Sequence, residues 1–467
     1  THKDNSGNGK PAERVRFCIA GNRDWHNAST VATSPITPQR AIRTVVAVSV
    51  LLSFTLHTED FHRAYLQSDR LAEPVYVWAP PEAGEPTNTV WAFHHARYGK
   101  NDSRRQFHFN THSRFCTIPN IKLSSAFDTV YLVPLHCAIS TYFDDTLNAG
   151  DTAFLSSVTA ILSRYSTHRP DHDTIQFADI SARTDADGIQ CDAGPYTSSI
   201  DPLPLPLPLS SPFDNPKLLH SLAAKLLWVG RVARPDVLTN ATQLANMLNP
   251  TGANARRAND TLATLSRLPI SLQYTKLDLP SLQVSVFADY SGSAISPLPK
   301  RQIGYLVALV ASSHRFSLLH WASHRPHRVR FGSCAGELFA LANAVATALY
   351  VRLLLQEHLC RRVPMAAYTD SSAAYDLITS FKDPIDMTGK NELFMLRRAL
   401  LDDTLRALHL VHGAQNPADA LSKPTYARPA SNTALNVALS TGLLRPLGRA
   451  HTTPDSDHNA PRLPNQA

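Results

Sequence analysis

The chain has 467 residues, enough for two or three domains of ~150 residues each. Apolar residues make up 43% of it, and no uninterrupted apolar run approaches the ~18 residues that a membrane span needs, so we expect a soluble intracellular protein with no membrane partner. Lys and Arg outnumber Asp and Glu by 45 to 38, a formal charge of +7, which is a modest bias toward polyanionic partners.

The cysteine pattern predicts neither a disulfide framework nor a zinc module. Six cysteines are scattered along the chain without a C-x-x-C pair or a zinc-knuckle spacing, which fits a reducing setting. The chain carries no signal peptide and begins with Thr rather than Met, so we expect a segment of a longer product.

Low-complexity stretches divide the chain. Residues 1–13 are polar, and residues 429–467 are rich in Pro, Asn, Asp and His, so both ends are predicted to be disordered. The stretch 198–216, SSIDPLPLPLPLSSPFDNP, has alternating prolines that exclude a helix and favour an extended, polyproline-like form. It is either a linker between domains or a surface insertion within one domain.

The first folded block contains two adjacent aspartates, Asp144 and Asp145, in ISTYFDDTLNAGD. An Asp-Asp pair by itself is usually a solvated turn. Here apolar and aromatic residues continue up to the acids, which indicates a strand–turn–strand hairpin. Two carboxylates in one dry site repel unless a cation lies between them and a third acid, and Asp60 in TEDFHRAYLQSD is a candidate for that third ligand. A pair of Mg²⁺ ions would satisfy such a site.

The second folded block predicts helices followed by a mixed sheet. Residues 217–248 have apolar residues at helical spacing and indicate one or two helices. Residues 282–289 alternate as a strand, 301–311 and 315–324 form a hairpin around SSH, and 336–359 form a long Ala/Leu helix. Residues 363–370 and 408–413 are two further strands. The order β-β-β-α-β-α-β-α implies a mixed α/β sheet.

Four acids stand at the ends of these predicted elements: Asp289, Glu337, Asp370 and Asp419. Spacing alone is weak support, because a chain with 38 acidic residues offers many combinations. Side chains at the termini of different elements nevertheless converge on one edge of a sheet, which makes these four a candidate metal site.

The motifs resemble those of copia-type (pseudoviral) retrotransposon polyproteins. YFDD resembles the Y-x-D-D box of reverse transcriptases, and EDFHRAYLQSD resembles the family's D-x-x-x-A-Y-L-Q motif. EPVYVWAPPEA, RYGKNDSRRQF and RVRFCIAGNRD are similar to further phrases of that polymerase. The resemblance implies Asp60, Asp144 and Asp145 as catalytic metal ligands. It also implies Tyr65, Tyr142 and Arg16 as substrate-binding residues. Tyr65 would be an aromatic gate under the sugar.

The second block resembles the ribonuclease H region at the C-terminus of the same polyproteins. The matching phrases are FADYS, AGELFALANA, YTDSSAAYD and NPADALSK, with HWASHRPHRVRFGS as the preceding hairpin strand and basic link. The resemblance implies a four-carboxylate catalytic site of Asp289, Glu337, Asp370 and Asp419. Basic residues also cluster in the link: Arg325, His327, Arg328 and Arg330. For this cluster we favour a contact with the phosphates of the nucleic-acid backbone, with Arg328 as the candidate residue.

The resemblance therefore implies an α/β (α+β) chain. Its predicted parts are right-hand polymerase fingers and palm over 14–197, the proline-rich stretch 198–216, a helical thumb or connection over 217–278, and a ribonuclease H-like mixed-sheet domain over 281–428. The implied cofactors are two Mg²⁺ per site, with Mn²⁺ possible. The implied partners are an RNA template, a DNA primer, RNA–DNA hybrid, dNTPs and other parts of the polyprotein, in the cytoplasm (a virus-like particle) or the nucleus.

Some residues depart from the family pattern. Arg97 and Lys100 stand where the polymerase motif has leucines, and Phe107 replaces its tryptophan, so we expect the two cations to point to solvent or phosphate. Two alternatives stay open. The chain is a degenerate remnant that binds nucleic acid without catalysis, or it is active only as a ribonuclease H. Three smaller interpretations complete the set: His168 and His172 lie in a loop, Trp321 packs in the core, and Ser371 caps a helix.

Overall fold

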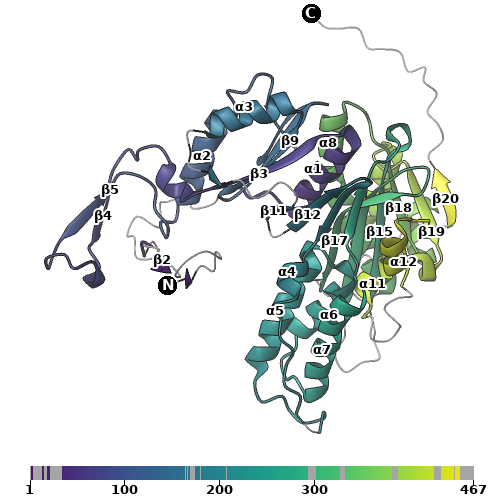
Figure 1. The fold of residues 1–467 in the computed structure, drawn as a ribbon. Helices are drawn as coiled ribbons and strands as arrows, with labels where there is room; N and C mark the ends of the chain where they lie inside the picture. Colours follow the sequence, from purple (N-terminus) through teal and green to yellow (C-terminus); the bar gives the residue numbers. More distant parts are fainter. Residues whose placement is uncertain are drawn as a thin grey trace, which may run out of the picture. The chain divides into compact units, whose positions relative to one another are not determined.

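The computed structural model describes the following residues: 2–3, 13–14, 18–20, 34–163, 165, 167–168, 174–178, 180–206, 208–292, 301–326, 332–380, 388–424, 433–445 and 448–452. The chain divides into two compact units (Figure 1). The first comprises Thr1–Thr37, His57–Ser124 and Asp128–Pro170, and the second comprises Pro38–Leu56, Ser125–Phe127 and Asp171–Ala467.

The first unit is built on a six-stranded sheet in the order β10-β3-β9-β8-β7-β6. Its strands are β3 (Thr55–Phe61), β6 (Lys122–Leu123), β7 (Val130–Val133), β8 (Cys137–Tyr142), β9 (Asp145–Gly150) and β10 (Thr167–His168). Helices α2 (Ser103–Phe115) and α3 (Thr152–Leu162) belong to the same unit. Phe61, Phe107 and Tyr165 meet edge to face in its core, with ring centroids 5.1–6.1 Å apart.

Two small strand pairs complete the first unit. Strands β4 (Val75–Trp78) and β5 (Val90–Phe93) form an antiparallel hairpin, and β1 (His2–Lys3) pairs with β2 (Glu13–Arg14). The β1–β2 pair lies largely within residues 1–13, a stretch that the sequence predicts to be disordered.

The second unit contains a four-stranded antiparallel sheet and a group of helices. The sheet runs β11 (Ile175–Phe177), β12 (Ile180–Asp185), β13 (Gly188–Asp192) and β14 (Leu272–Thr275), followed along the chain from β13 by the short helix α4 (Gly194–Thr197). Because β13 pairs with β14, the chain leaves this sheet at residue 192 and returns at 272, and the proline-rich stretch 198–216 lies within the unit.

Helices α5 (Pro216–Val232), α6 (Pro235–Ala245) and α7 (Gly252–Arg267) pack beside one another (Figure 1). One or two helices were expected between 217 and 248, and two are present. They separate at Pro235, which occupies the first turn of α6, where its missing N–H has no cost. The buried Arg234 side chain pairs with Asp236 at 2.9 Å and donates to the Leu265 carbonyl at 2.9 Å, which ties α6 to the end of α7.

A six-stranded mixed sheet forms the rest of the second unit, in the order β17-β16-β15-β18-β19-β20. Its strands are β15 (Gln283–Ser291), β16 (Gln302–Val310), β17 (Phe316–His324), β18 (Met365–Thr369), β19 (Ala407–Val411) and β20 (Gly448–Thr452). Strands β15, β18 and β19 are parallel, whereas β16, β17 and β20 join antiparallel. The predicted mixed α/β sheet is confirmed.

The helices of this sheet are α8 (Ser333–Leu359), α9 (Ser372–Ser380), α10 (Lys390–Leu401), α11 (Asp419–Ser422) and α12 (Ala434–Thr441). Helix α10 was not among the elements expected from the sequence. Ser371 accepts a hydrogen bond from the Ala374 N–H at 3.3 Å, so its prediction as a helix cap is confirmed.

Helix α8 is, among the described residues, the one helix long and apolar enough to cross a membrane by length and composition. No uninterrupted apolar run in the sequence reveals this helix, because its apolar residues are interspersed with a few polar ones. It packs along β15 and β16, and 56% of its most apolar stretch is buried inside the protein, which fits a core helix.

Helix α1 (Gln39–Leu52) belongs to the second unit, although the sequence assigns these residues to the polymerase block. Arg43 on α1 donates to the Val232 carbonyl at 2.9 Å and lies 3.8 Å above the ring of Trp321 on β17. The Trp321 N–H donates to the Gly230 carbonyl at 2.7 Å, so the prediction that this residue packs in the core is confirmed. These contacts explain why α1 lies with the second unit.

The tail predicted to be disordered from residue 429 is partly ordered, which corrects that expectation. Leu435 and Leu439 of α12 are one turn apart and buried, and β20 pairs with the edge of β19. The buried leucines let α12 pack, and the open edge of the sheet lets β20 pair with β19. Composition alone reveals neither contact.

Candidate functional site

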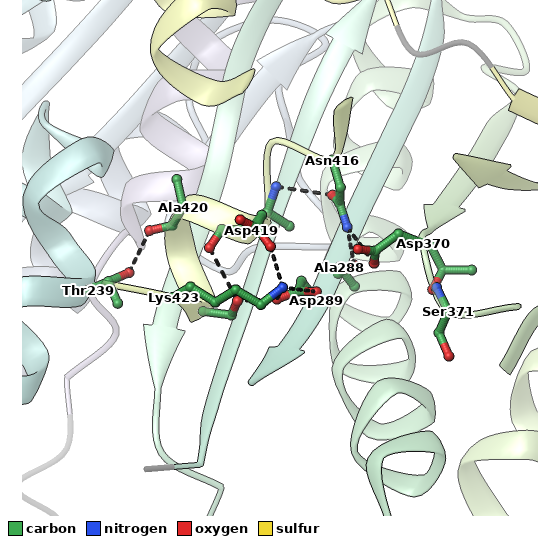
Figure 2. A network of polar contacts seen from close by, with 12 residues as sticks. Thr239, Ala288, Asp289, Asp370, Ser371, Asn416, Asp419, Ala420 and Lys423 are labelled. Atoms are coloured by element: carbon green, nitrogen blue, oxygen red, sulfur yellow. Dashed lines mark hydrogen bonds and ion pairs between the residues drawn. The ribbon is translucent and has the colours of Figure 1, made fainter. Parts of the chain in front are cut away.

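Three aspartates meet at one end of the mixed sheet. Asp289 lies near the end of β15, Asp370 directly follows the neighbouring parallel strand β18, and Asp419 begins α11 (Figure 2). One carboxylate oxygen from each lies within 4.8 Å of the others. Parallel neighbours end at the same edge of a sheet, which is why residues so distant in sequence converge here.

Asn416 fixes two parts of this edge. Its amide donates to the Ala288 carbonyl at 2.9 Å and to Asp370 Oδ1 at 3.0 Å, and its own oxygen accepts from the Ala418 N–H at 3.1 Å. Asn416 is buried and therefore holds Asp370 in place relative to β15 and to the start of α11. A side chain at Gly413 would approach Asp370 Oδ2 to 3.0 Å, so the absence of a Cβ there leaves this carboxylate its space.

Lys423 and Ser422 surround Asp289. The Lys423 ammonium lies 3.4 Å from Asp289 Oδ2 and pairs with Asp419 Oδ1 (Figure 2). The Ser422 hydroxyl donates to Asp289 Oδ2. Burial alone would lower the pKa of Lys423, but the adjacent Asp289 and Asp419 carboxylates raise it. The ammonium is therefore charged at neutral pH.

Glu337, on the first turns of α8, lies near these aspartates but is not among the acids whose oxygens lie within 4.8 Å of one another. Burial, followed by the nearby charges of Asp289 and Asp370, raises its pKa to about 9. Its Oε2 atom is buried and has no hydrogen-bond partner within the described part of the chain. Gly336 allows α8 to lie close to β15, since a Cβ at Gly336 would lie 2.3 Å from the ring of Tyr290.

The group has the chemistry of a divalent-cation site. Burial is also the main cause that raises the pKa of Asp289, with Asp370 and Asp419 adding to it and Lys423 opposing it. Carboxylate oxygens are the ligands that Mg²⁺ prefers, and a buried carboxylate oxygen without a partner is what a cation would satisfy. Asp289, Asp370 and Asp419 are therefore compatible with a divalent-cation site, and the role of Glu337 as a fourth ligand stays a prediction.

The aspartates of the first unit occupy a hairpin as expected. Tyr142, the last residue of β8, pairs with Asp145, the first residue of β9, and Phe143 and Asp144 form the turn between the two strands. Phe143 has φ 55°, a conformation that is rare for a bulky residue and typical of strained functional turns. The Phe61 N–H donates to the Asp144 carbonyl at 2.9 Å, so β3, which carries Asp60, runs beside this turn.

The carboxylates of the first unit are not as close as those of the second. Among the described residues, Asp60, Asp144 and Asp145 do not form a group with ligand atoms within 4.8 Å of one another. Asp60 is exposed on β3, and Asp144 and Asp145 are half-buried. Their role as metal ligands stays a prediction.

The predicted substrate-binding residues lie in different settings. Tyr65 is 8% exposed, with its ring 4.8 Å from that of Tyr98 in the core of the first unit, and Tyr142 lies 4.8 Å from the ring of Phe143. Arg16 and Arg328 lie outside the described residues. All four roles stay predictions.

The expectation that Lys100 points to solvent or phosphate is wrong. Its side chain is 17% exposed and its ammonium pairs with Asp102 at 2.5 Å, because the chain supplies a carboxylate two residues away. Arg97 is half-buried and stacks on Phe93 at 4.4 Å, and burial lowers its pKa. His168 also differs from the prediction of a loop, since it lies in β10 opposite Asp60, and His172 lies outside the described residues.

Sequence reasoning missed four residues beside the candidate sites: Asn416, Ser422, Lys423 and Arg104. Asn416 and Lys423 both lie in NPADALSK, and Lys423 is four residues after Asp419, a spacing that allows an ion pair on a helix. Arg104 on α2 lies 4.3 Å above the ring of Phe143 in the aspartate turn, a contact between distant segments that carries no local signal.

Comparisons with known proteins find similarity at the level of fold. No protein-family model matches the chain, and no curated protein matches it. A ribonuclease H1 from Halobacterium salinarum is similar to 30% of this chain over 94% of its own length, at 20% identity and a TM-score of 0.23.

Two structures of a foamy-virus protease–reverse transcriptase are also similar. The native prototype foamy virus protein shares 12% identity over 82% of this chain and 46% of its own, with a TM-score of 0.23. The foamy viral protein in complex with dsDNA shares 11% identity over 73% of this chain and 66% of its own, with a TM-score of 0.20. This chain thus spans about half the length of the native foamy virus chain.

Proposed function

We propose that the second unit is a metal-dependent nuclease of the ribonuclease H type, which cuts the RNA strand of an RNA–DNA hybrid. The observation that carries this proposal is the convergence of Asp289, Asp370 and Asp419, from three different elements, with ligand oxygens within 4.8 Å of one another. The half-buried Glu337 adds a fourth carboxyl nearby, and the charges of Asp289 and Asp370 contribute to its raised pKa. The motif phrases of this region favour a place in the polyprotein of a copia-type retrotransposon.

The residues at this site would have different roles. Asp289, Glu337, Asp370 and Asp419 would hold two Mg²⁺ ions, which when bound stabilise the attacking and leaving oxygens of phosphodiester hydrolysis. Asn416 orients the Asp370 carboxylate, and the Ser422 hydroxyl orients that of Asp289. Both contacts reduce the rearrangement that metal binding requires.

Cleavage of a labelled RNA–DNA hybrid in Mg²⁺ tests this function. Asp370→Asn should lower the cleavage rate by roughly 10²-fold or more, since removing even an outer partner of a metal ligand commonly costs 10–100-fold. Asp376→Asn is the matched control, because Asp376 is an exposed acid on α9 of the same unit, and it should cleave as the unaltered protein does. Equal cleavage by both variants would refute the assignment.

The first unit favours a second function, DNA synthesis on an RNA template from dNTPs. The supporting observation is the backbone bond from Phe61 to Asp144, which brings the strand of Asp60 beside the Asp144–Asp145 turn. In this proposal the three aspartates hold Mg²⁺ and Tyr65, Tyr142 and Arg16 contact the nucleotide. Primer extension on poly(rA)/oligo(dT) should depend on Asp144, and extension no greater than that of Asp144→Asn would contradict it.

The two assays together separate the alternatives. Hybrid cleavage without primer extension would select a protein active only as a ribonuclease H. Hybrid binding that weakens with salt, without cleavage and unchanged by Asp370→Asn, would select a remnant that binds nucleic acid without catalysis. The proposed location is a cytoplasmic particle or the nucleus.

A further inference from the structure

Lys423 brings an ammonium group into the carboxylate group of the second unit. Its Nζ atom lies 3.4 Å from Asp289 Oδ2 and pairs with Asp419 Oδ1 (Figure 2). Two of the three aspartates that can share a metal ion are therefore already bridged by a cation that belongs to the chain. The proposed function assigns no role to this residue.

The backbone that carries Lys423 is held firmly. The Lys423 N–H donates to the Asp419 carbonyl at 2.9 Å, and the Ser422 hydroxyl also reaches the Asp419 carbonyl at 3.2 Å. On the opposite side of the turn, the Thr239 hydroxyl donates to the Ala420 carbonyl at 2.8 Å (Figure 2). Only the flexible stem of Lys423 is left to move, and its side chain is 41% exposed, so the ammonium has a path to solvent.

A divalent cation and this ammonium would compete for the same oxygens. Both carry positive charge, and both are attracted to Asp289 and Asp419, so they repel each other if they share that position. A metal ion that binds both aspartates must therefore displace the ammonium along its exposed path. Without a metal ion, the same ammonium offsets the repulsion among the buried acids.

We propose that Lys423 is a built-in counter-cation, which neutralises Asp289 and Asp419 in the metal-free protein and competes with the divalent cation for them. This inference rests on the proposed nuclease site. Lys423 acts through the two aspartates and is a positioning residue rather than a catalytic one.

Metal binding to a Lys423→Met variant of the full chain tests the competition. Methionine keeps an unbranched stem and removes the charge. Mn²⁺ titrated by calorimetry, after subtraction of the Asp370→Asn isotherm to isolate this site, should bind about tenfold more tightly than in the unaltered protein, which corresponds to an ion pair of about 1.4 kcal/mol. Lys225→Met, at an exposed lysine of α5, makes the same change in net charge and should leave the affinity unchanged.

A second measurement needs no substitution at Lys423. The ammonium should leave its ion pairs when Mn²⁺ binds, so acetylation of Lys423, followed by mass spectrometry, should become several-fold faster in Mn²⁺. Lys276 and Lys390 serve as internal references whose rates should not change. In Asp370→Asn the acceleration at Lys423 should be lost.

The outcomes distinguish this inference from the function on which it rests. Mn²⁺ affinity that is equal or weaker in Lys423→Met, or an acetylation rate of Lys423 that does not respond to bound Mn²⁺, overturns the inference and leaves the nuclease site intact. An unaltered protein whose isotherm matches that of Asp370→Asn has no metal at this site, and that result overturns the proposed function and the inference together.

Discussion

At the scale of single residues, the dominant feature is a set of acids that lie close together, of which Asp289 is buried and the others are half-buried. Burial and the neighbouring carboxylates raise the pKa of Glu337 to about 9, and burial raises that of Asp289. The folded protein therefore holds protons at this site that the unfolded chain releases at lower pH. A carboxyl whose pKa is higher in the folded state makes the fold less stable as pH rises between its two pKa values.

Stability without metal should consequently fall as pH rises from 7 to 8.5. Below that window the buried His320 and His358 act in the opposite direction, since burial lowers their pKa values to about 3 and about 4. Within it, Glu337 should cost roughly 2 kcal/mol of unfolding free energy. Thermal unfolding in EDTA should show this decline, and Glu337→Gln should flatten it.

The control for this prediction is Asp376→Asn, which removes an exposed acid of the same unit and should keep the decline. A midpoint of the unaltered protein that stays constant or rises from pH 7 to 8.5 would show that Glu337 is ionised in the metal-free fold.

The acids themselves were predictable from the sequence, whereas their partners were not. Asp289 and Asp370 end predicted strands, and parallel strands bring their carboxyl ends to one edge, so local pattern sufficed. The roles of Asn416 and Lys423 depend on where the segment 413–423 folds back across that edge. No periodicity encodes this return, and Lys423 read from sequence alone is an ordinary surface cation.

At the scale of elements, the site depends on how closely α11 approaches the sheet. Gly304 on β16 lies directly across from Asp289 on β15, so both positions face the same side of the sheet. A Cβ at Gly304 would lie 2.4 Å from the Leu421 carbonyl carbon and 2.5 Å from the Ser422 nitrogen. The missing side chain thus makes room for the turn that carries Asp419, Ser422 and Lys423.

Gly304→Ala should therefore displace α11. We expect a loss of about 1–3 kcal/mol in stability, the usual cost of adding a methyl group to a packed site, and a loss of hybrid cleavage and Mn²⁺ binding. Gly194→Ala is the control, since its nearest contact would be an Asp192 side-chain oxygen at 3.2 Å. Full cleavage by Gly304→Ala would show that α11 is not positioned by this contact.

Arg43 joins α1 to two other elements of the second unit. It donates to carbonyls at the end of α5 and stacks on Trp321 of β17. Burial lowers its pKa to about 10, so the guanidinium remains charged at neutral pH. An arginine fully buried in this way was not foreseeable, because the sequence of α1 otherwise indicates only an apolar helix.

Arg43→Met should destabilise the second unit by about 3 kcal/mol, since buried carbonyls lose a charged donor and Trp321 loses its cation. Arg40→Met, one turn earlier on the same helix, should cost less than about 1 kcal/mol, because Arg40 stacks more distantly on Phe127 and Tyr350. Chemical denaturation followed by tryptophan fluorescence measures both. Equal effects of the two substitutions would contradict the account of Arg43.

At the scale of the whole molecule, the second unit is assembled from separated segments. Pro38–Leu56 and residues 171–197 join it, although motif order predicts a polymerase block that runs without interruption from 14 to 197. Motifs mark where chemistry lies and carry no information on which apolar surfaces cover one another. Strand β17, which holds Trp321, packs against α1, β14 and α6, all of which precede the predicted ribonuclease H-like domain.

A fragment of residues 281–428 should therefore fail to fold as a stable domain. It lacks α1, α6 and β14 and would expose the apolar face of β17. Size-exclusion chromatography with binding of an apolar dye should show aggregation or a loosely packed state, in contrast to the full chain. A monodisperse fragment with cooperative unfolding would show that these segments are not required.

The central claim is that Asp289, Glu337, Asp370 and Asp419 form a site for divalent cations. Anomalous diffraction from crystals of the full chain soaked in Mn²⁺ tests it most directly. We expect a manganese peak among these four carboxylates, with the Lys423 ammonium moved away from Asp289. A crystal that takes up Mn²⁺ elsewhere while Lys423 keeps its ion pairs with Asp289 and Asp419, and no peak appears between the acids, would contradict it.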